Sequence, residues 1–288
     1  MKEILNKLRR YEIHIRKAIN TRMHGDFHSV FKGSGLEFSD VRSYQYGDDV
    51  RSIDWIVSAK GHGTYVKVFQ EEKEQNVVFL LDVSASQNIG VERKQKIDLA
   101  REIAGVLTLS AIKEKGHVGL IAFSDQKELF IQPDKGLKHA YQVLFSMFEL
   151  KPLSQKTNLN KALLFALNLL KRKSIVILIS DFIDDNYEAH LTALARKHDL
   201  VVIHLSDQRE FSFPSLGIIP LYDKESQKTI WVNSSSKKFR EKIKNSYAEN
   251  REKLEQLCRS RKANYLWVDT QEDYVPKLVR LFKVRKSI

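Results

Sequence analysis

An aspartate and two serines follow a short apolar run in the first third of the chain. Residues 77–81 are all apolar, Asp82 ends the run, and Ser84 and Ser86 follow at every second position. Alternate residues of an extended chain point the same way, so the carboxylate and the two hydroxyls can converge. Hard oxygen donors suit Mg²⁺ or Mn²⁺ better than zinc. The spacing indicates a divalent-cation site; the alternative is that these residues only cap the next helix.

Such a site requires a strand that ends at the ligand-binding edge of a sheet. Five apolar residues without alternation are typical of a strand covered on both faces, as in parallel sheets. Similar runs occupy 117–123, 174–180 and 200–205, with a shorter strand expected at 128–131. Between and after them we expect helices near 91–114, 137–149, 158–172, 187–198, 235–260 and 273–284, with a last strand at 264–268.

This alternation of strands and helices predicts an α/β fold with a doubly wound, Rossmann-like, mostly parallel sheet. Sheets of this kind bind ligands beyond the carboxyl ends of their strands, which is where Asp82, Ser84 and Ser86 would lie. Two further oxygen donors belong to the same edge. Thr157 precedes a predicted helix and Asp181 ends the 174–180 strand, although each could also be only a helix cap or a turn residue.

The order of these three oxygen-bearing loops resembles the metal-ion-dependent adhesion site of von Willebrand factor A domains. The resemblance continues upstream. Residues 33–72, GSGLEFSDVRSYQYGDDVRSIDWIVSAKGHGTYVKVFQEE, are similar to the segment that precedes this domain in one bacterial family, called domain of unknown function fifty-eight. Its glycine-rich start and its LEF, VR, Y, GDD, R and IDW motifs are all present. Including SDQREF and the later helices, the likeness covers the chain from about Thr21 onward.

The resemblance implies a metal site made by Asp82, Ser84, Ser86, Thr157 and Asp181, with Mg²⁺ or Mn²⁺ as the ion. In such sites the serines and the threonine touch the ion, the aspartates act largely through water, and a partner protein supplies the last carboxylate. Neutral hydroxyls leave the ion with unneutralised positive charge, so it attracts an outside acid. The resemblance also implies a MoxR-type AAA ATPase as the partner, in protein remodelling or complex maturation.

The loop before Thr157 departs from the family pattern. Gln155 and Lys156 stand where the family often has glycines, and Asn158 where an acid is common. A lysine beside a cation site adds like-charge repulsion, which would weaken metal binding unless Lys156 points away.

The rest of the chain divides at residue 75. In residues 1–75, the spacing of apolar residues predicts an amino-terminal helix at 2–20, and the loop signals that follow predict an irregular, β-rich appendage packed on the main domain. Residues 76–288 are expected to form the domain that resembles von Willebrand factor A, with a hairpin insertion near 217–233 that turns at 224–227.

The composition of the chain limits where the protein can be located in the cell. The 288 residues contain one cysteine, Cys258, which excludes an internal disulfide and fits a reducing compartment. No apolar run approaches the roughly 20 residues that span a bilayer, and the amino terminus lacks the apolar centre of a signal peptide. These features predict a cytoplasmic protein.

Two other functions compete with a non-enzymatic adaptor. The net charge of +12 is concentrated at the two ends of the chain, which suggests nucleic-acid binding, but aromatic residues are not interleaved with the basic ones in the way that base-stacking surfaces need. Asp48, Asp49 and Asp54 could serve a metal-dependent hydrolase. The neighbouring Arg42, Arg51 and Trp55 favour a buried ion-pair network instead.

Overall fold

The protein is described by a computed structural model for residues 36–61, 63–71, 75–91, 94–212, 214–223 and 228–285. The predicted helix at 2–20 and the predicted turn at 224–227 lie outside these residues.

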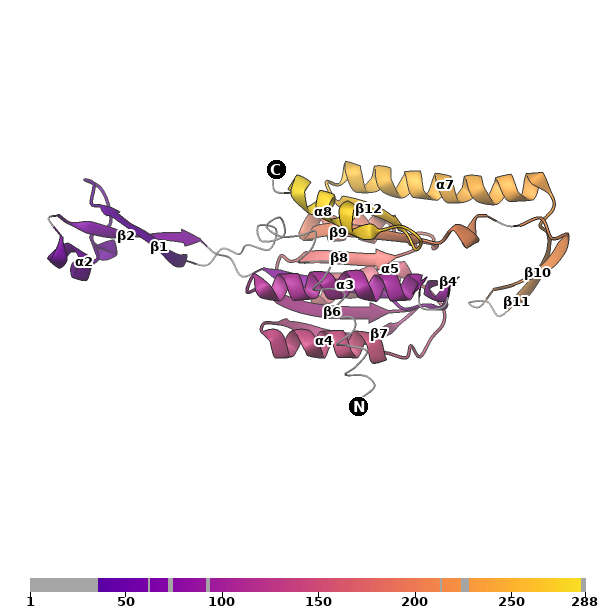
Figure 1. Ribbon diagram of the computed structural model, residues 1–288, viewed down its shortest axis with the longest axis horizontal. Helices are drawn as coiled ribbons and strands as arrows, with labels where there is room; N and C mark the ends of the chain where they lie inside the picture. The colour runs from indigo at the N-terminus through magenta and orange to yellow at the C-terminus, as the bar shows by residue number, and fades with distance from the viewer. Residues whose placement is uncertain are drawn as a thin grey trace.

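A six-stranded sheet forms the centre of the main domain, in the order β12-β9-β8-β3-β6-β7 (Figure 1). Five strands pair in parallel and β7 pairs antiparallel with β6, so the predicted doubly wound, mostly parallel sheet is confirmed. The strands are β3 (Asn76–Asp82), β6 (His117–Phe123), β7 (Lys127–Asp134), β8 (Ile175–Ser180), β9 (Asp199–Ser206) and β12 (Asn264–Asp269).

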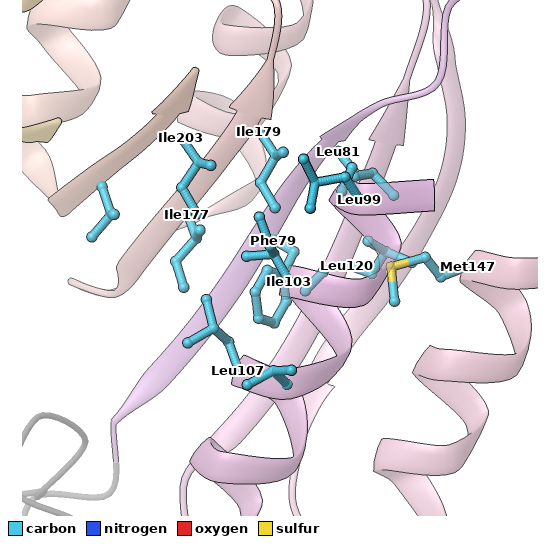
Figure 2. Close-up of a cluster of buried hydrophobic side chains, with 14 of the residues drawn as sticks. Phe79, Leu81, Leu99, Ile103, Leu107, Leu120, Met147, Ile177, Ile179 and Ile203 are labelled. Carbon is cyan, nitrogen blue, oxygen red and sulfur yellow. The ribbon is translucent and has the colours of Figure 1, made fainter. Parts of the chain in front are cut away.

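The uninterrupted apolar runs become central strands because helices cover both faces of the sheet. On β3, Phe79 and Leu81 face one apolar cluster, while Val78 and Leu80 face another. Helices α3 (Lys96–Lys113), α4 (Leu137–Glu149) and α8 (Tyr274–Arg285) pack in the first cluster, part of which is drawn in Figure 2. Helices α5 (Leu159–Leu169), α6 (Glu188–Lys197) and α7 (Lys237–Ser260) pack in the second.

Helix α3 begins later than the predicted 91–114. The strands β4 (Gly90–Val91) and β5 (Lys94–Gln95) instead form a short antiparallel pair before it. Gly90 adopts a φ of +144°, and a Cβ there would lie 2.5 Å from the carbonyl oxygen of Lys94. This tight pairing ends in a capping box between Gln95 and Asp98, which starts the helix at Lys96.

The appendage is a small hairpin unit built from β1 (Leu36–Ser43), η1 (Val50–Ser52), α2 (Trp55–Lys60) and β2 (Tyr65–Glu71). Strands β1 and β2 pair antiparallel with one irregularity between Phe38 and Asp40. Figure 1 draws the unit apart from the main sheet. Residues 72–74, between Glu71 and Gln75, lie outside the description, so docking of the appendage onto the main domain stays a prediction.

The predicted hairpin near 217–233 is present as β10 (Ile218–Asp223) paired antiparallel with β11 (Lys228–Asn233). Helix α7 follows it directly and returns along the sheet to β12 (Figure 1). Within the described residues, every helix is too short or too polar to cross a membrane.

A buried histidine is expected to make the fold sensitive to acid. His198, which ends α6, is 3% exposed, and both ring nitrogens are buried without a hydrogen-bond partner. Burial, helped by the charge of Lys197, lowers the pKa of His198 from 6.5 to about 4. An unfolded histidine takes up its proton near its ordinary pKa, so the stability due to this residue is present above that pH and lost as the pH falls toward 4.

We expect His198 to account for a loss of about 3 kcal/mol of unfolding free energy as the pH falls from 7 to 4. The measurement is urea unfolding of the wild type and of His198→Leu across this range. The variant should lose correspondingly less stability in acid; two parallel pH profiles would contradict the assignment.

Candidate metal centre

Two aspartates from neighbouring strands meet at the carboxyl edge of the sheet. Asp82 is the last residue of β3, and Asp181 directly follows β8, which pairs with β3. Both side chains are buried. Burial, together with the charge of Asp181, raises the pKa of Asp82 to about 7. The two carboxylates are therefore close enough for their charges to interact.

The loop after β3 brings the two serines to the same place. Ser84 precedes the short helix η2 (Ala85–Asn88), and its backbone N–H donates to Asp82 Oδ1 over 3.0 Å. The hydroxyl oxygens of Ser84 and Ser86 lie 3.0 Å apart. Ser86 also hydrogen-bonds to Asp181, which helps to lower the pKa of that carboxyl. Asp82, Ser84, Ser86 and Asp181 thus form one cluster.

Asp82 is held by polar neighbours on its second oxygen. Ser180 Oγ donates to Asp82 Oδ2 over 2.6 Å, and Gln87 Nε2 donates to the same oxygen over 3.3 Å. These bonds fix the orientation of the carboxylate, because each donor comes from a different segment of chain. Such an arrangement holds a ligand group in place before any ion arrives.

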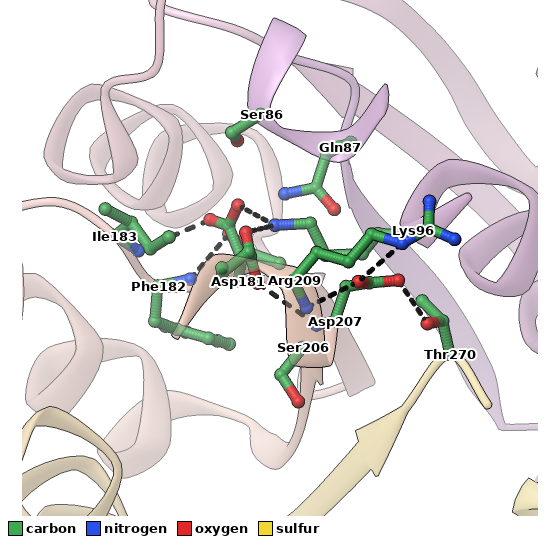
Figure 3. Close-up of polar contacts among 12 residues, drawn as sticks. Ser86, Gln87, Lys96, Asp181, Phe182, Ile183, Ser206, Asp207, Arg209 and Thr270 are labelled. Carbon is green, nitrogen blue, oxygen red and sulfur yellow. Dashed lines mark hydrogen bonds and ion pairs between the residues drawn. The ribbon is translucent and has the colours of Figure 1, made fainter. Parts of the chain in front are cut away.

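A buried lysine contacts one member of this cluster, Asp181 (Figure 3). Lys96, the first residue of α3, is fully buried, and its Nζ lies 2.7 Å from Asp181 Oδ2. The same ammonium contacts Glu210 Oε1. Burial alone would lower the pKa of Lys96, but the two carboxylates raise it above its ordinary value, so the side chain stays charged.

The same ion pair sets the charge of the two acids. Burial alone would raise the pKa of Asp181, but the Lys96 ammonium lowers it, so Asp181 is ionised. Burial raises the pKa of Glu210 despite Lys96. Glu210 belongs to the short helix η3 (Gln208–Glu210), where its other oxygen accepts from the backbone N–H of Asp207 over 3.1 Å.

The loop that carries Thr157 touches the serine loop through its backbone. The N–H of Ala85 donates to the carbonyl oxygen of Gln155 over 2.9 Å, and Thr157 is half-buried two residues later. Lys156 is exposed, as metal binding by its neighbours requires. The lysine that enters the cluster is Lys96.

The residues present fit a divalent cation. Adjacent oxygen ligands of an octahedral Mg²⁺ lie about 3.0 Å apart, since each is about 2.1 Å from the ion. The two serine hydroxyls have this separation. In the arrangement that the family resemblance implies, Ser84, Ser86 and Thr157 would hold the ion, with Asp82 and Asp181 behind them.

Comparison with known proteins then identifies the family. The family model described as "Protein of unknown function DUF58" matches residues 40–253, which is most of the chain. The chain belongs to this family. The resemblance inferred from residues 33–72 is therefore confirmed.

Curated relatives match this DUF58 protein over different shares of its length. "Uncharacterized protein Rv1480" of Mycobacterium tuberculosis (strain ATCC 25618 / H37Rv) is 26% identical over 282 residues, which cover 97% of this chain and 89% of that protein. "Uncharacterized protein MAV169" of Mycobacterium avium is 27% identical over 117 residues, 40% of this chain and 69% of that protein.

Solved structures are more distant. BatB, a conserved hypothetical protein from Bacteroides thetaiotaomicron, is 14% identical and has a TM-score of 0.47, with 74% of this chain and all of that chain covered. The SpRpn10 VWA domain is 11% identical and has a TM-score of 0.37, with 71% and 93% covered.

Lys96 and Glu210 were missed by the sequence reasoning about this DUF58 chain. A signal for Lys96 was present, because helical spacing places it over Ala100 on the apolar stripe of α3. A lysine at a buried position requires a carboxylate partner. Glu210 belongs to the SDQREF motif, but the sequence gives no means of pairing it with a lysine more than one hundred residues away.

The acids of the appendage are used in local structure. Arg42 makes a two-pronged contact with Asp48, both distances being 2.7 Å, while Asp49 caps η1 and Asp54 caps α2. The prediction that this ion-pair network is buried is wrong. Arg42 and Trp55 are exposed, because the two-stranded unit is too small to cover them.

In the described part of the chain, no three or more His, Cys, Asp or Glu side chains are grouped to hold a metal.

Proposed function

We propose that this DUF58 chain is a non-enzymatic, metal-dependent protein-interaction module. Its carboxyl edge would present Mg²⁺ or Mn²⁺ to an acidic residue of a partner protein. The observation that supports this proposal is the convergence of Asp82, Ser84, Ser86 and Asp181 from two neighbouring strand ends. When bound, the ion would supply an electrophilic site for an outside carboxylate.

The protein's own residues would leave the ion able to attract an outside carboxylate. Ser84 and Ser86 offer neutral oxygens, so they reduce the ion's charge less than carboxylates would. Lys96 already neutralises part of Asp181, which limits the negative charge that the site directs at the ion. An incoming carboxylate therefore gains more from the ion than it would at a site lined by acids.

The partner implied by the family resemblance is a MoxR-type AAA ATPase, with a role in remodelling or maturing client proteins. The ATPase or its client would contribute the acidic residue. Affinity from the ion alone would be modest, and the surrounding surface would add the rest.

The hydrolase alternative is weaker, because Asp48, Asp49 and Asp54 each serve a local contact. The nucleic-acid alternative predicts binding that falls steeply with salt and does not respond to Mg²⁺.

Calorimetric titration of the full chain with Mg²⁺ and Mn²⁺ tests the metal site directly. The wild type is expected to bind one ion, and Ser84→Ala is expected to weaken that binding at least about tenfold through loss of a ligand. Ser110→Ala is the matched control, since Ser110 is also buried but donates within α3 to the carbonyl oxygen of Val106. Equal titrations of all three proteins would refute the assignment.

A second measurement tests the partner. A MoxR-type ATPase from the same genome should bind the immobilised chain in Mg²⁺, and both chelator and Ser84→Ala should abolish the binding. If the ATPase binds equally well with and without chelator, the metal takes no part in the interaction.

A further inference from the structure

The β10–β11 hairpin carries an exposed apolar face that the metal site does not use. Pro220 pairs directly with Trp231, so these two side chains share a face of the ribbon. Ile218 and Tyr222 flank Pro220 at alternate positions and lie on the same face. Ile218, Tyr222 and Trp231 are 68%, 60% and 68% exposed. We call Ile218, Pro220, Tyr222 and Trp231 the hairpin face.

The hairpin is anchored firmly at its base. Ser234 is fully buried, and its hydroxyl donates to the carbonyl oxygen of Gly217 over 2.9 Å and accepts from the N–H of Leu216 over 3.0 Å. Ser235 Oγ accepts from the N–H of Gly217 over 2.9 Å. An exposed apolar face that contains a tryptophan and a tyrosine, on a hairpin held by these hydrogen bonds, has the composition of a binding hot spot.

The hairpin leaves the sheet at the same edge as the candidate metal centre. Glu210, which contacts Lys96, is in η3 between β9 and β10, and Phe211 beside it packs on Tyr247 of α7 with ring centroids 5.8 Å apart. Figure 1 shows β10 and β11 at the end of the molecule where β4 follows the serine loop. The two features therefore lie toward the same end of the molecule.

The positive charge beside the hairpin face favours an acidic binding partner. The start of α7 carries five basic residues against Glu241, and β11 begins with the exposed Lys228. The basic residues are Lys237, Lys238, Arg240, Lys242 and Lys244. A second copy of this chain would bring the same positive charge and be repelled, whereas an acidic segment would be attracted.

The backbone of the hairpin favours a polypeptide over a lipid surface. Among the described residues, β10 and β11 pair only with each other, so each strand has one edge free to add an extended chain. An added strand would satisfy these backbone groups, and its alternate side chains would meet the hairpin face. A lipid surface offers no such pairing.

We propose that the hairpin face binds an extended, acidic protein segment through its apolar or aromatic side chains. The segment's placement of an acid on the metal rests on the function proposed above; its docking on the hairpin does not. Trp231 is the anchor of the contact, because it lies opposite Pro220 with Ile218 and Tyr222 on either side.

Selection of phage-displayed random peptides of about twelve residues on the immobilised full chain in Mg²⁺ tests this inference. We expect the selected peptides to combine Asp or Glu with aromatic or aliphatic residues. Fluorescence anisotropy with the synthetic peptides then gives affinities. Trp231→Ser should weaken binding by at least about tenfold.

Trp55→Ser is the matched control, because Trp55 has nearly the same exposure, 67%, on the appendage. It should leave the affinity within about twofold of the wild type. Both variants should keep the wild-type melting temperature, since neither side chain is buried. Equal effects of the two substitutions, no effect of Trp231→Ser, or selection of no peptides or of basic peptides would overturn the proposal.

Two further arms separate the possible outcomes. Loss of peptide binding in chelator or in Ser84→Ala reports on the metal, so failure of that arm alone refutes the proposed function and leaves the hairpin contact standing. Vesicles of phosphatidylglycerol and of phosphatidylcholine are the second arm. Binding to the anionic vesicles that is lost in Trp231→Ser would assign the hairpin face to a membrane and overturn the protein partner.

Discussion

Replacing Lys96 by methionine is expected to lower the free energy of unfolding by about 3–5 kcal/mol, one of the largest effects available in this protein. The substitution removes the ammonium that contacts both Asp181 and Glu210. Both carboxylates are buried, so each would be left charged without its partner or would have to take up a proton. Urea unfolding of the wild type and the variant at neutral pH measures the difference.

Two controls show whether the effect comes from the buried ion pair. Lys156→Met removes an exposed lysine from the neighbouring loop and should change stability by less than about 0.5 kcal/mol. The double variant Lys96→Met/Glu210→Gln should recover part of the loss, because only one uncompensated carboxylate remains. If Lys96→Met proves no more destabilising than Lys156→Met, the ion pair does not stabilise the fold.

The second large effect is on metal-dependent stability. At a concentration about one hundred times the dissociation constant, Mg²⁺ should stabilise the wild type by about 2.7 kcal/mol, seen as a higher melting temperature. Asp82→Asn should abolish this gain, because it removes one of the two carboxylates behind the serines. The Asn side chain still accepts from Ser84 N–H, so the loop should keep its shape.

Without metal, the same variant is expected to be more stable than the wild type at about pH 8. Burial raises the pKa of Asp82 to about 7, above its value of 3.8 when unperturbed. The folded wild type therefore holds a proton that the unfolded chain has lost, and its stability falls as the pH rises between these values. Asparagine has no charge to bury and should not show this fall.

Asp269→Asn is the control for the metal experiment. Asp269 is also buried and also ends a parallel strand, β12, but that strand lies at the opposite edge of the sheet from β7, beyond β9 and β8. This variant should keep the full response to Mg²⁺. A wild type whose stability ignores both Mg²⁺ and Mn²⁺ would contradict a working metal site.

Most of the main domain could be predicted because its core strands and helices follow from the local pattern of apolar residues along the chain. The apolar runs at 174–180 and 200–205 became β8 and β9, and the predicted helix at 137–149 is α4 with the same bounds. The start of α3 was misjudged, since the apolar stripe of a helix gives no sign of the tight β4–β5 pairing before it. That pairing depends on the positive φ of Gly90.

The candidate site was predictable in one respect and not in another. Asp82 and Asp181 each end an apolar strand, so their meeting follows from the parallel sheet itself. The position of Lys96 depends on how α3 packs over the strand ends, which is a tertiary property. The sequence directed attention to Lys156, which is nearer to Thr157 along the chain but exposed in the fold.

The ion pair at Lys96 joins parts of the chain that are far apart in sequence, 85 residues from Asp181 and 114 from Glu210. Closing such long loops has an entropic cost, so we expect this contact to form late in folding. A contact made late in folding affects the rate of unfolding more than the rate of folding. The ammonium of Lys96 is therefore expected to slow unfolding, so that it governs the lifetime of the folded protein and has little effect on the rate at which the protein folds.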